Sequence, residues 1–371
     1  MKAVAVFPGS KRIDLIDQPP LDKIPPSGVR LKMLEVGICG TDKEIASFQY
    51  GTPPKGSDHL IIGHESLAEI EEVGSAVRRV KKGDLVVSMV RRPCNHPECT
   101  PCRLGRQDFC ITGDYVERGI KEINGFMTSF VIDEEKYLHK VPANLREVAV
   151  LVEPLTIAEK AFFQLDTVQR RLPGYLQHKG NAATQPHNAL VLGAGPVGLL
   201  GCMALVLRGY RTNIFSREGE NSKKAQIVKS VGARYFSGEK YQLPQIAEEI
   251  GNIDVIYEAT GASGLAFDAM RYIGINGVFI FTGVPGRKAP IKVDTDLLMR
   301  NMVLNNQIVL GTVNAGANAY EAAIQSVGEF FQRWPESIRS LITGRYPIEA
   351  YQDLLSGKIT GIKNVIRLEK Q

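Results

Sequence analysis

A glycine-rich turn between an apolar strand and an apolar helix constrains the fold of this chain more than any other feature of its sequence. The turn is Gly193-Ala194-Gly195-Pro196-Val197-Gly198, with a strand pattern at 189–192 before it and a helix pattern at 196–207 after it. The same alternation of strand and helix patterns continues downstream at 212–215, 222–231, 254–258 and 277–282. Such alternation builds a parallel sheet with helices on both faces. The sequence therefore predicts an α/β domain in this half of the chain.

The spacing of the glycines in this turn is typical of a dinucleotide site. The first glycine allows the tight turn, the second lets the backbone approach a pyrophosphate, and the third lets the helix pack closely. The N-terminus of the helix then binds phosphate through its free N–H groups. A chance glycine-rich turn is the alternative, and the strand before it and the helix after it argue against that. We expect Gly193, Gly195, Pro196, Val197 and Gly198 to contact the cofactor.

The end of the next strand bears on which nicotinamide cofactor is used. An acidic residue there binds the ribose of NAD, whereas arginine accommodates the 2′-phosphate of NADP. The chain has Ser216 and Arg217 at this place, with Glu218 following. NADP is favoured, and NAD remains open if Glu218 turns toward the ribose. A solvated surface arginine is the alternative reading of Arg217.

The first 150 residues follow a different pattern. Short apolar or alternating segments at 29–36, 67–73, 85–90 and 126–132 are separated by Gly, Pro and Asp, which is typical of a largely β domain. A chain of 371 residues is expected to form two domains. We place the first over 1–186, with 173–186 as a polar linker or loop, and the second over 187–340. The chain then returns to the first domain over 341–371.

Composition and charge argue against nucleic acid and membranes as binding partners. The net charge of +5 is mild for this length, and no basic stripe interleaved with aromatic residues indicates nucleic acid. No apolar run approaches the roughly 20 residues of a membrane span. A basic and then apolar N-terminal signal is also missing, so we expect a cytoplasmic protein without a membrane or nucleic-acid partner.

Four of the six cysteines lie within one short stretch. Cys94, Cys99, Cys102 and Cys110 have the spacing C-x4-C-x2-C-x7-C. A cysteine cluster in a reducing compartment indicates metal binding sooner than disulfides, and four thiolates suit tetrahedral structural zinc. His96 lies inside the stretch and could replace one thiolate. A redox loop is the alternative.

A second metal centre is suggested upstream. Cys39 lies in Gly37-Ile38-Cys39-Gly40-Thr41-Asp42, and His64 and Glu65 lie in Ile62-Gly63-His64-Glu65. Catalytic zinc needs about three protein ligands and an open position. Cys39 and His64, with one or both of Glu65 and Glu153, can provide them. Asp42 can orient the imidazole from behind. Two unrelated buried residues are the alternative for an isolated Cys and His.

In their order along the chain, these motifs resemble the medium-chain zinc-containing alcohol dehydrogenase superfamily. Arg91-Arg92-Pro93, the run 105–110, Gly125-Phe126-Met127, Glu153-Pro154-Leu155 and Gly311-Thr312-Val313-Asn314 resemble its archaeal glucose dehydrogenases. The resemblance implies an α/β fold with a GroES-like β-barrel catalytic domain and a doubly wound Rossmann domain. It also implies oxidation of an aldose at C1 to the lactone, with NADP or NAD as acceptor and one catalytic and one structural zinc ion per chain.

The resemblance further assigns roles to single residues. It places Thr41 beside the metal as the first proton acceptor, and places Glu117, Glu153 and Asn314 near the sugar. It brings the cofactor near Ser216, Arg217, Glu218, Thr282, Val284, Val313, Asn314 and Lys363, the last at the pyrophosphate. Homodimers or homotetramers are expected. A polyol or secondary-alcohol dehydrogenase of the same superfamily is the nearest alternative, because polyol enzymes share the Cys, His and Glu ligands. Val90 and Leu304 stand where some sugar-specific members carry polar groups, which bears on the choice of sugar.

Overall fold

The chain forms two compact units. The computed structural model describes residues 1–19, 23–173, 175, 187–286 and 290–369. Unit 1 comprises Met1–Thr156 and Asn314–Gln371, and unit 2 comprises Ile157–Val313. These divisions differ from the expected limits at 186 and 340. The first falls inside α3 (Val152–Gln169), and the expected linker at 173–186 lies outside the described residues except for 173 and 175.

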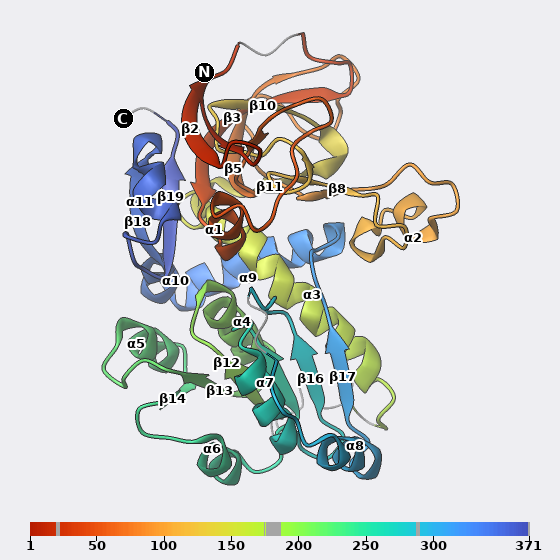
Figure 1. The fold of residues 1–371 in the computed structure, drawn as a ribbon, viewed down its shortest axis with the longest axis vertical. Helices are drawn as coiled ribbons and strands as arrows, with labels where there is room; N and C mark the ends of the chain where they lie inside the picture. The colour runs from red at the N-terminus through yellow and green to blue at the C-terminus, as the bar shows by residue number, and fades with distance from the viewer. Residues whose placement is uncertain (20–22, 174, 176–186, 287–289, 370–371) are drawn as a thin grey trace. The chain divides into compact units, whose positions relative to one another are not determined.

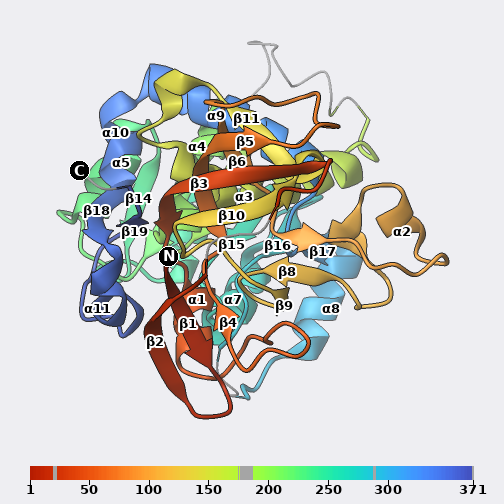
Figure 2. The same cartoon turned by 90° about the horizontal axis from the view of Figure 1, so that it is seen from above.

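Unit 1 is built around a mainly antiparallel sheet whose central strand is β3. The strand order is β11-β6-β5-β3-β19-β18, and β10 also pairs with β3. Figure 2 shows β3, β5, β6, β10 and β11 running side by side. The strands are β3 (Gly28–Gly37), β5 (Glu65–Val73), β6 (Leu85–Ser88), β10 (Phe130–Glu134), β11 (Leu138–Val141), β18 (Ile342–Pro347) and β19 (Lys363–Arg367).

Two smaller sheets complete the β structure described in unit 1. One has the order β2-β1-β4 and the other β7-β8-β9. Their strands are β1 (Lys2–Phe7), β2 (Arg12–Asp17), β4 (Leu60–Ile61), β7 (Arg91–Arg92), β8 (Val116–Arg118) and β9 (Glu122–Ile123). The helices of this unit are α1 (Gly40–Ala46), α2 (Thr100–Arg103), α9 (Ala317–Arg333), α10 (Pro335–Leu341) and α11 (Tyr351–Leu355). Short 3-10 turns lie at Gln107–Phe109, Glu135–Tyr137, Ala143–Leu145, Ala149–Leu151 and Ile348–Ala350.

The alternation predicted for the β segments is present in the first part of β3, where Leu31 and Met33 are buried and Lys32 between them is exposed. From Met33 to the end of the strand every residue is buried. One expected strand begins later than predicted. Instead of continuing a ladder, Phe126 and Met127 donate their N–H groups to Gly63 and Ile62, so β10 starts only at Phe130. Phe126 and Met127 thus fill the core without forming the strand.

Unit 2 contains the predicted parallel sheet. Its strand order is β14-β13-β12-β15-β16-β17, with every described pairing parallel. In chain order this is 3-2-1-4-5-6, the doubly wound arrangement, and Figure 1 shows the strands together with helices against them. The strands are β12 (Asn188–Leu192), β13 (Arg211–Ser216), β14 (Arg234–Ser237), β15 (Val255–Glu258), β16 (Val278–Phe281) and β17 (Ile308–Gly311). The helices are α4 (Pro196–Leu207), α5 (Lys223–Ser230), α6 (Leu243–Ile250), α7 (Ser263–Ala269) and α8 (Thr295–Leu304), with a 3-10 turn at Met270–Tyr272.

The chain returns to unit 1 earlier than predicted, and α9 explains why. Its buried face includes Tyr320, Ala323, Val327 and Phe330, and the Tyr320 ring stacks on His139 of β11 with 5.1 Å between ring centroids.

Among the described residues, no helix is long and apolar enough to cross a bilayer.

The stacked His139 should make unfolding depend on pH. Burial, with a smaller contribution from Arg79, lowers the pKa of His139 to about 4, whereas an unfolded histidine titrates near 6.5. The unfolded chain therefore binds more protons between these values, and this group's stabilisation is present above about pH 6.5 and is lost as pH falls toward 4. We expect His139→Gln to flatten the rise in unfolding free energy between pH 4.5 and 6.5, by on the order of 2 kcal/mol.

Urea unfolding at several pH values measures this slope. His59→Gln serves as the control, since His59 is only partly buried, and it should keep the slope of the parent protein. An unchanged slope in the His139 variant would contradict the burial argument.

Candidate functional site

The four clustered cysteines form a lobe between β7 and β8. Their sulfur atoms all lie within 4.8 Å of one another. Cys99 is the N-cap of α2 and Cys102 lies within it, so one short helix presents two of the four thiols. All six cysteines of the chain are free thiols, and the predicted arrangement for a tetrahedral metal is present. His96 lies outside the cluster, because its ring bonds Asp114 at 2.5 Å and approaches Glu98 at 3.2 Å.

One of these thiols is prepared for ionisation by its surroundings. Burial opposes a charge on Cys110, but hydrogen bonds from Thr112 and from the backbone of Gly113 lower its pKa to about 6. Burial raises the pKa of Cys102 in the opposite direction. A bound cation would have to deprotonate Cys102, as soft divalent metals do.

The second cluster joins Cys39 to His64 and Glu65, two adjacent residues that follow it by 25 positions or more in the sequence. Cys39, His64 and Glu65 offer ligand atoms within 4.8 Å of one another. Cys39 caps α1, and its N–H donates to Asp42 Oδ2 at 2.8 Å. Asp42 Oδ1 lies 3.4 Å from His64 Nδ1, and both atoms are buried without a hydrogen-bond partner. A sulfur, an imidazole nitrogen and a carboxylate fit zinc, and a small adjustment would let Asp42 hold the imidazole for it.

Glu65 is held by a partner that the sequence did not suggest. Lys363 Nζ lies 2.6 Å from both Glu65 oxygens and donates to the Ile38 carbonyl at 3.1 Å. Both side chains are about 2 % exposed or less. Gly37 makes room for the carboxylate, since a Cβ there would lie 2.1 Å from a Glu65 oxygen. Lys363 was expected at the pyrophosphate, but its donors are used inside unit 1, and this expectation needs correction.

Glu153 has no such partner among the described residues. It lies at the start of α3 and is buried, and it falls outside the group of three close ligand atoms. Burial raises its pKa to about 7, with His64 opposing and Glu65 adding to the rise. At neutral pH both protonation states of Glu153 are therefore populated.

Two of the residues expected at the sugar, Glu117 and Asn314, form a second group within unit 1. Glu117 Oε1 accepts hydrogen bonds from Asn314 Nδ2 at 2.9 Å and from Arg91 Nε at 3.0 Å. Asn314 has a positive φ of 59°, and its Oδ1 accepts from the Ala315 N–H at 2.8 Å, which fixes the amide. Thr41 lies in the first turn of α1, two residues after Cys39, and is partly buried. Arg91 was not among the predicted site residues.

In unit 2 the glycine turn has the predicted form. Gly193 has φ 97°, and a Cβ at Gly198 would lie 2.0 Å from the Gly193 carbonyl oxygen. Gly195 is the N-cap of α4 and Pro196 its first residue, so the helix N-terminus is open toward a phosphate. Side chains at Gly193 and Gly198 would close the turn.

Two charged residues directly follow β13, and only one of them, Glu218, is bonded to another described side chain. Lys224 bonds the Glu218 carboxylate, and Tyr235 donates to the Glu218 carbonyl at 2.8 Å. Arg217 is exposed and has no partner among the described residues. The acidic side chain is thus occupied while the guanidinium is available.

A buried glutamate that the sequence did not single out organises the loops after β15 and β16. Glu258 Oε1 accepts from the backbone of Thr260 and Gly261 at 2.6 and 2.9 Å, and Oε2 accepts from Gly283 at 3.2 Å. Thr282 donates to the Glu258 carbonyl at 2.6 Å. The predicted cofactor contacts Val284 and Val313 are 70 % and 55 % exposed, which leaves them free to contact a ligand. A glutamate inside an apolar strand was the available signal.

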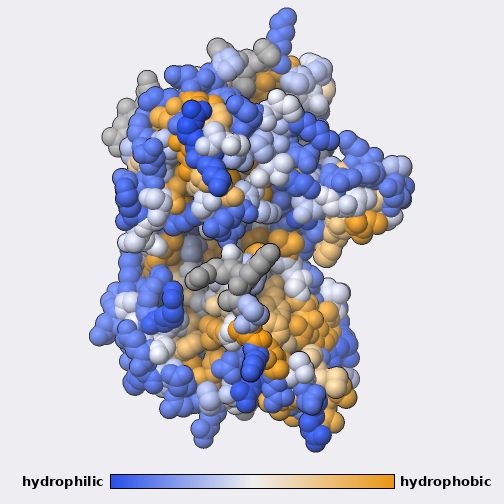
Figure 3. Space-filling view, in the orientation of Figure 1, coloured by the Kyte–Doolittle hydropathy of each residue, from blue (hydrophilic) through white to orange (hydrophobic). Residues whose placement is uncertain are grey.

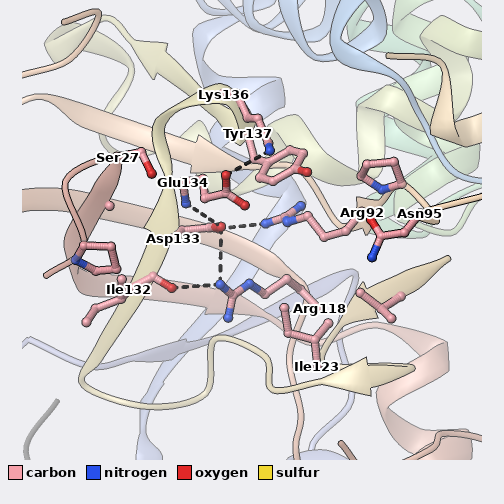
Figure 4. Close-up of a pocket in the computed structure, with 14 residues that line it drawn as sticks. Ser27, Arg92, Asn95, Arg118, Ile123, Ile132, Asp133, Glu134, Lys136 and Tyr137 are labelled. Carbon is pink, nitrogen blue, oxygen red and sulfur yellow. Dashed lines mark hydrogen bonds and ion pairs between the residues drawn. The ribbon is translucent and has the colours of Figure 1, made fainter. Parts of the chain in front are cut away.

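A cavity of about 460 Å³ beside the cysteine lobe does not belong to either cluster. Figure 4 shows Arg92 and Arg118 converging on Asp133 within it. The distances are 2.7 Å and 3.3 Å, and Ser88 Oγ also donates to Asp133 at 2.6 Å. Burial opposes the charge of Asp133, but the two guanidinium groups hold its pKa below the ordinary value. The Nη groups of both arginines already bond protein oxygens, so this network joins β7 and β8 to β10.

The Lys363 ion pair leads to a stability prediction. Lys363→Met leaves the Glu65 carboxylate buried without its partner, which should cost about 3–5 kcal/mol of unfolding free energy. The double variant Lys363→Met/Glu65→Gln removes the unpaired charge and should recover a large part of that loss. Urea unfolding of both variants measures the difference, and equal losses would contradict an ion-pair role.

The comparisons with known proteins agree with this geometry. The description "Alcohol dehydrogenase GroES-like domain" matches residues 25–143, and "Glucose dehydrogenase C-terminus" matches residues 146–368. The chain is 38 % identical to glucose 1-dehydrogenase of Methanocella arvoryzae, with 99 % of each chain covered, and 38 % identical to that of Thermoproteus tenax, with 100 % of each covered.

A solved structure gives the same result for the fold. Haloferax mediterranei glucose dehydrogenase in complex with NADP, Zn and gluconolactone aligns over 100 % of both chains, with a TM-score of 0.86 and 29 % identity. The predicted α/β class with a GroES-like and a Rossmann domain is thereby confirmed. The chain belongs to the glucose dehydrogenase family of the zinc-containing medium-chain alcohol dehydrogenase superfamily.

Proposed function

We propose that this protein is a zinc-dependent, NADP-linked glucose 1-dehydrogenase that oxidises the C1 hydroxyl of an aldose to the aldonolactone. The observation that carries the proposal is the Cys39, His64 and Glu65 cluster in a chain that also has the open helix N-terminus after Gly193. When bound, zinc acts as a Lewis acid on the C1 hydroxyl and NADP accepts the hydride. The four-cysteine lobe holds a second, structural zinc ion.

Residues of this chain bind the metal, transfer the proton and bind the sugar. Cys39, His64 and Glu65 hold the catalytic metal, and Asp42 orients the imidazole. Thr41 accepts the proton of the C1 hydroxyl and passes its own hydroxyl proton on toward solvent. Glu153, whose pKa is raised to about 7, can hold a proton or bind a sugar hydroxyl near neutral pH. Glu117 and Asn314 bind sugar hydroxyls. NAD is the weaker alternative cofactor because Lys224 already holds Glu218.

The direct test of this proposal measures NADP and NAD reduction with glucose, galactose, xylose, sorbitol and simple secondary alcohols. We expect aldoses to be oxidised with NADP, and we expect loss of turnover in His64→Ala because the metal loses a ligand. Turnover of sorbitol or alcohols without any aldose would favour the polyol alternative. Full activity of His64→Ala, with zinc content unchanged, would remove the catalytic metal from the proposal.

Arg217 provides a separate prediction on cofactor choice. Charge-assisted hydrogen bonds to the 2′-phosphate are lost in Arg217→Met, which should lower kcat/KM for NADP by about 10- to 100-fold. The same parameter for NAD should change little. Arg211→Met is the matched control, since Arg211 is an exposed arginine at the other end of β13. An equal loss with both cofactors would exclude a phosphate contact.

We also propose self-association into dimers or tetramers, and a cytoplasmic location. β17 lies at the edge of the described sheet of unit 2, and Met299, Val303 and Leu304 of α8 are 63 %, 72 % and 63 % exposed. Figure 3 shows hydrophobic surface over this part of unit 2. Exposed apolar area of this kind and an open strand edge support subunit contacts, which light scattering would measure. The six free thiols support a reducing compartment.

A further inference from the structure

The two strands β7 and β8 present different charged groups on their two faces. Arg91 pairs with Glu117 in the antiparallel register, and Arg92 pairs with Val116. Because side chains alternate along a strand, Arg92 and Arg118 share the face that carries Asp133, as Figure 4 shows for both arginines. Arg91 and Glu117 share the other face. The consecutive residues Arg91 and Arg92 therefore contact different carboxylates on opposite faces of the two strands.

The guanidinium of Arg91 is fixed in position. Its Nε donates to Glu117 Oε1 at 3.0 Å, and its Cζ lies 3.7 Å from the centroid of the Tyr115 ring. The side chain is only about 5 % exposed. Stacking on an aromatic ring sets the plane of a guanidinium, and the Nε bond sets its direction within that plane.

Three polar groups remain free beside this contact. Glu117 Oε1 already accepts from Arg91 and Asn314, whereas Glu117 Oε2 and both Nη groups of Arg91 bond no described residue. None of the three is among the buried atoms that are closed off without a partner. An acceptor and a planar pair of donors are therefore held side by side, next to the Asn314 amide.

We propose that Arg91 is a substrate-binding and specificity-determining residue. One Nη group donates to a sugar hydroxyl while Glu117 Oε2 accepts from the neighbouring hydroxyl. This assignment rests on the proposed oxidation of aldoses, and it names the group of the sugar that is recognised, a pair of adjacent hydroxyls away from C1. A site built in this way discriminates strongly against an analogue that lacks one of the two hydroxyls, because a buried donor or acceptor is then left unpaired.

The test combines a protein change with a substrate change. Steady-state kinetics with NADP are measured for the parent protein and for Arg91→Met on glucose and on its 2-, 3-, 4- and 6-deoxy forms. Arg91→Met should lower kcat/KM for glucose by about 10- to 100-fold, mainly through KM. For one deoxyglucose the parent protein should already show a similar loss, and Arg91→Met should add little to it, because the deleted groups are partners.

Two further variants serve as controls. Arg91→Lys keeps the charge but loses the planar pair of donors, so it should keep the fold and recover part of the glucose activity; it carries the test if Arg91→Met does not fold. Arg92→Lys changes the neighbouring arginine on the Asp133 face. It should lower the melting temperature without changing the ratio of kcat/KM between glucose and any deoxyglucose.

The test depends on whether the effect of the Arg91 substitution and the effect of removing a sugar hydroxyl add independently. If Arg91→Met and Arg91→Lys reduce kcat/KM by the same factor for glucose and for every deoxyglucose, Arg91 contacts no hydroxyl and the inference is wrong, although aldose oxidation stands. If the parent protein oxidises no aldose, the proposed function fails and the inference falls with it. Coupling confined to a single hydroxyl position, where Arg91→Met adds little to the loss caused by the missing hydroxyl, supports the assignment.

Discussion

The pairing of the C-terminal strand β19 with β3 is the constraint on which the centre of unit 1 depends. Val365, Ile366 and Arg367 pair with residues 37, 36 and 35 of β3, more than 300 positions earlier in the chain. This pairing brings Lys363 next to Glu65 and the Ile38 carbonyl. The loop closed in this way costs conformational entropy, but the cost grows only slowly with loop length. A buried ammonium and a buried carboxylate then each find their counterion beside the candidate metal ligands.

Buried carboxylates in unit 1 are distinguished by their partners. Glu65 has a lysine, Asp133 has two arginines, and Glu117 has one arginine and an amide. Paired charges of this kind fix geometry more than they add stability. Glu153 stands apart, because burial raises its pKa to about 7, and this places its two protonation states near balance at neutral pH. Among the buried carboxyl groups that the structure describes in unit 1, Glu153 is the one without an ion pair and is thus suited to exchanging a proton.

Much of the fold could be predicted from the sequence because the relevant signals are local. The glycine turn, the helix at 196–207 and the alternation on β3 follow from backbone sterics and burial within a few residues. The candidate ligands Cys39, His64 and Glu65, and the four cysteines, could be named from spacing, and the structure brings each set together. Other features could not be predicted from the sequence: the partner of Lys363, the roles of Arg91 and Glu258, and the early return of the chain to unit 1 at Asn314. Each depends on a contact between distant segments, for which a single sequence has no periodic signature.

The opposite orientation of Arg91 and Arg92 has a consequence for how such a protein can diversify. A two-stranded ribbon lets one face be altered while the other is left in place, so changes around Glu117 need not disturb the Asp133 network that ties the base of the cysteine lobe to β10. Mutational drift on the first face would change which sugars are accepted, while the second face keeps the lobe attached. Selection can therefore explore new substrates here without first acquiring compensating stability elsewhere in the chain.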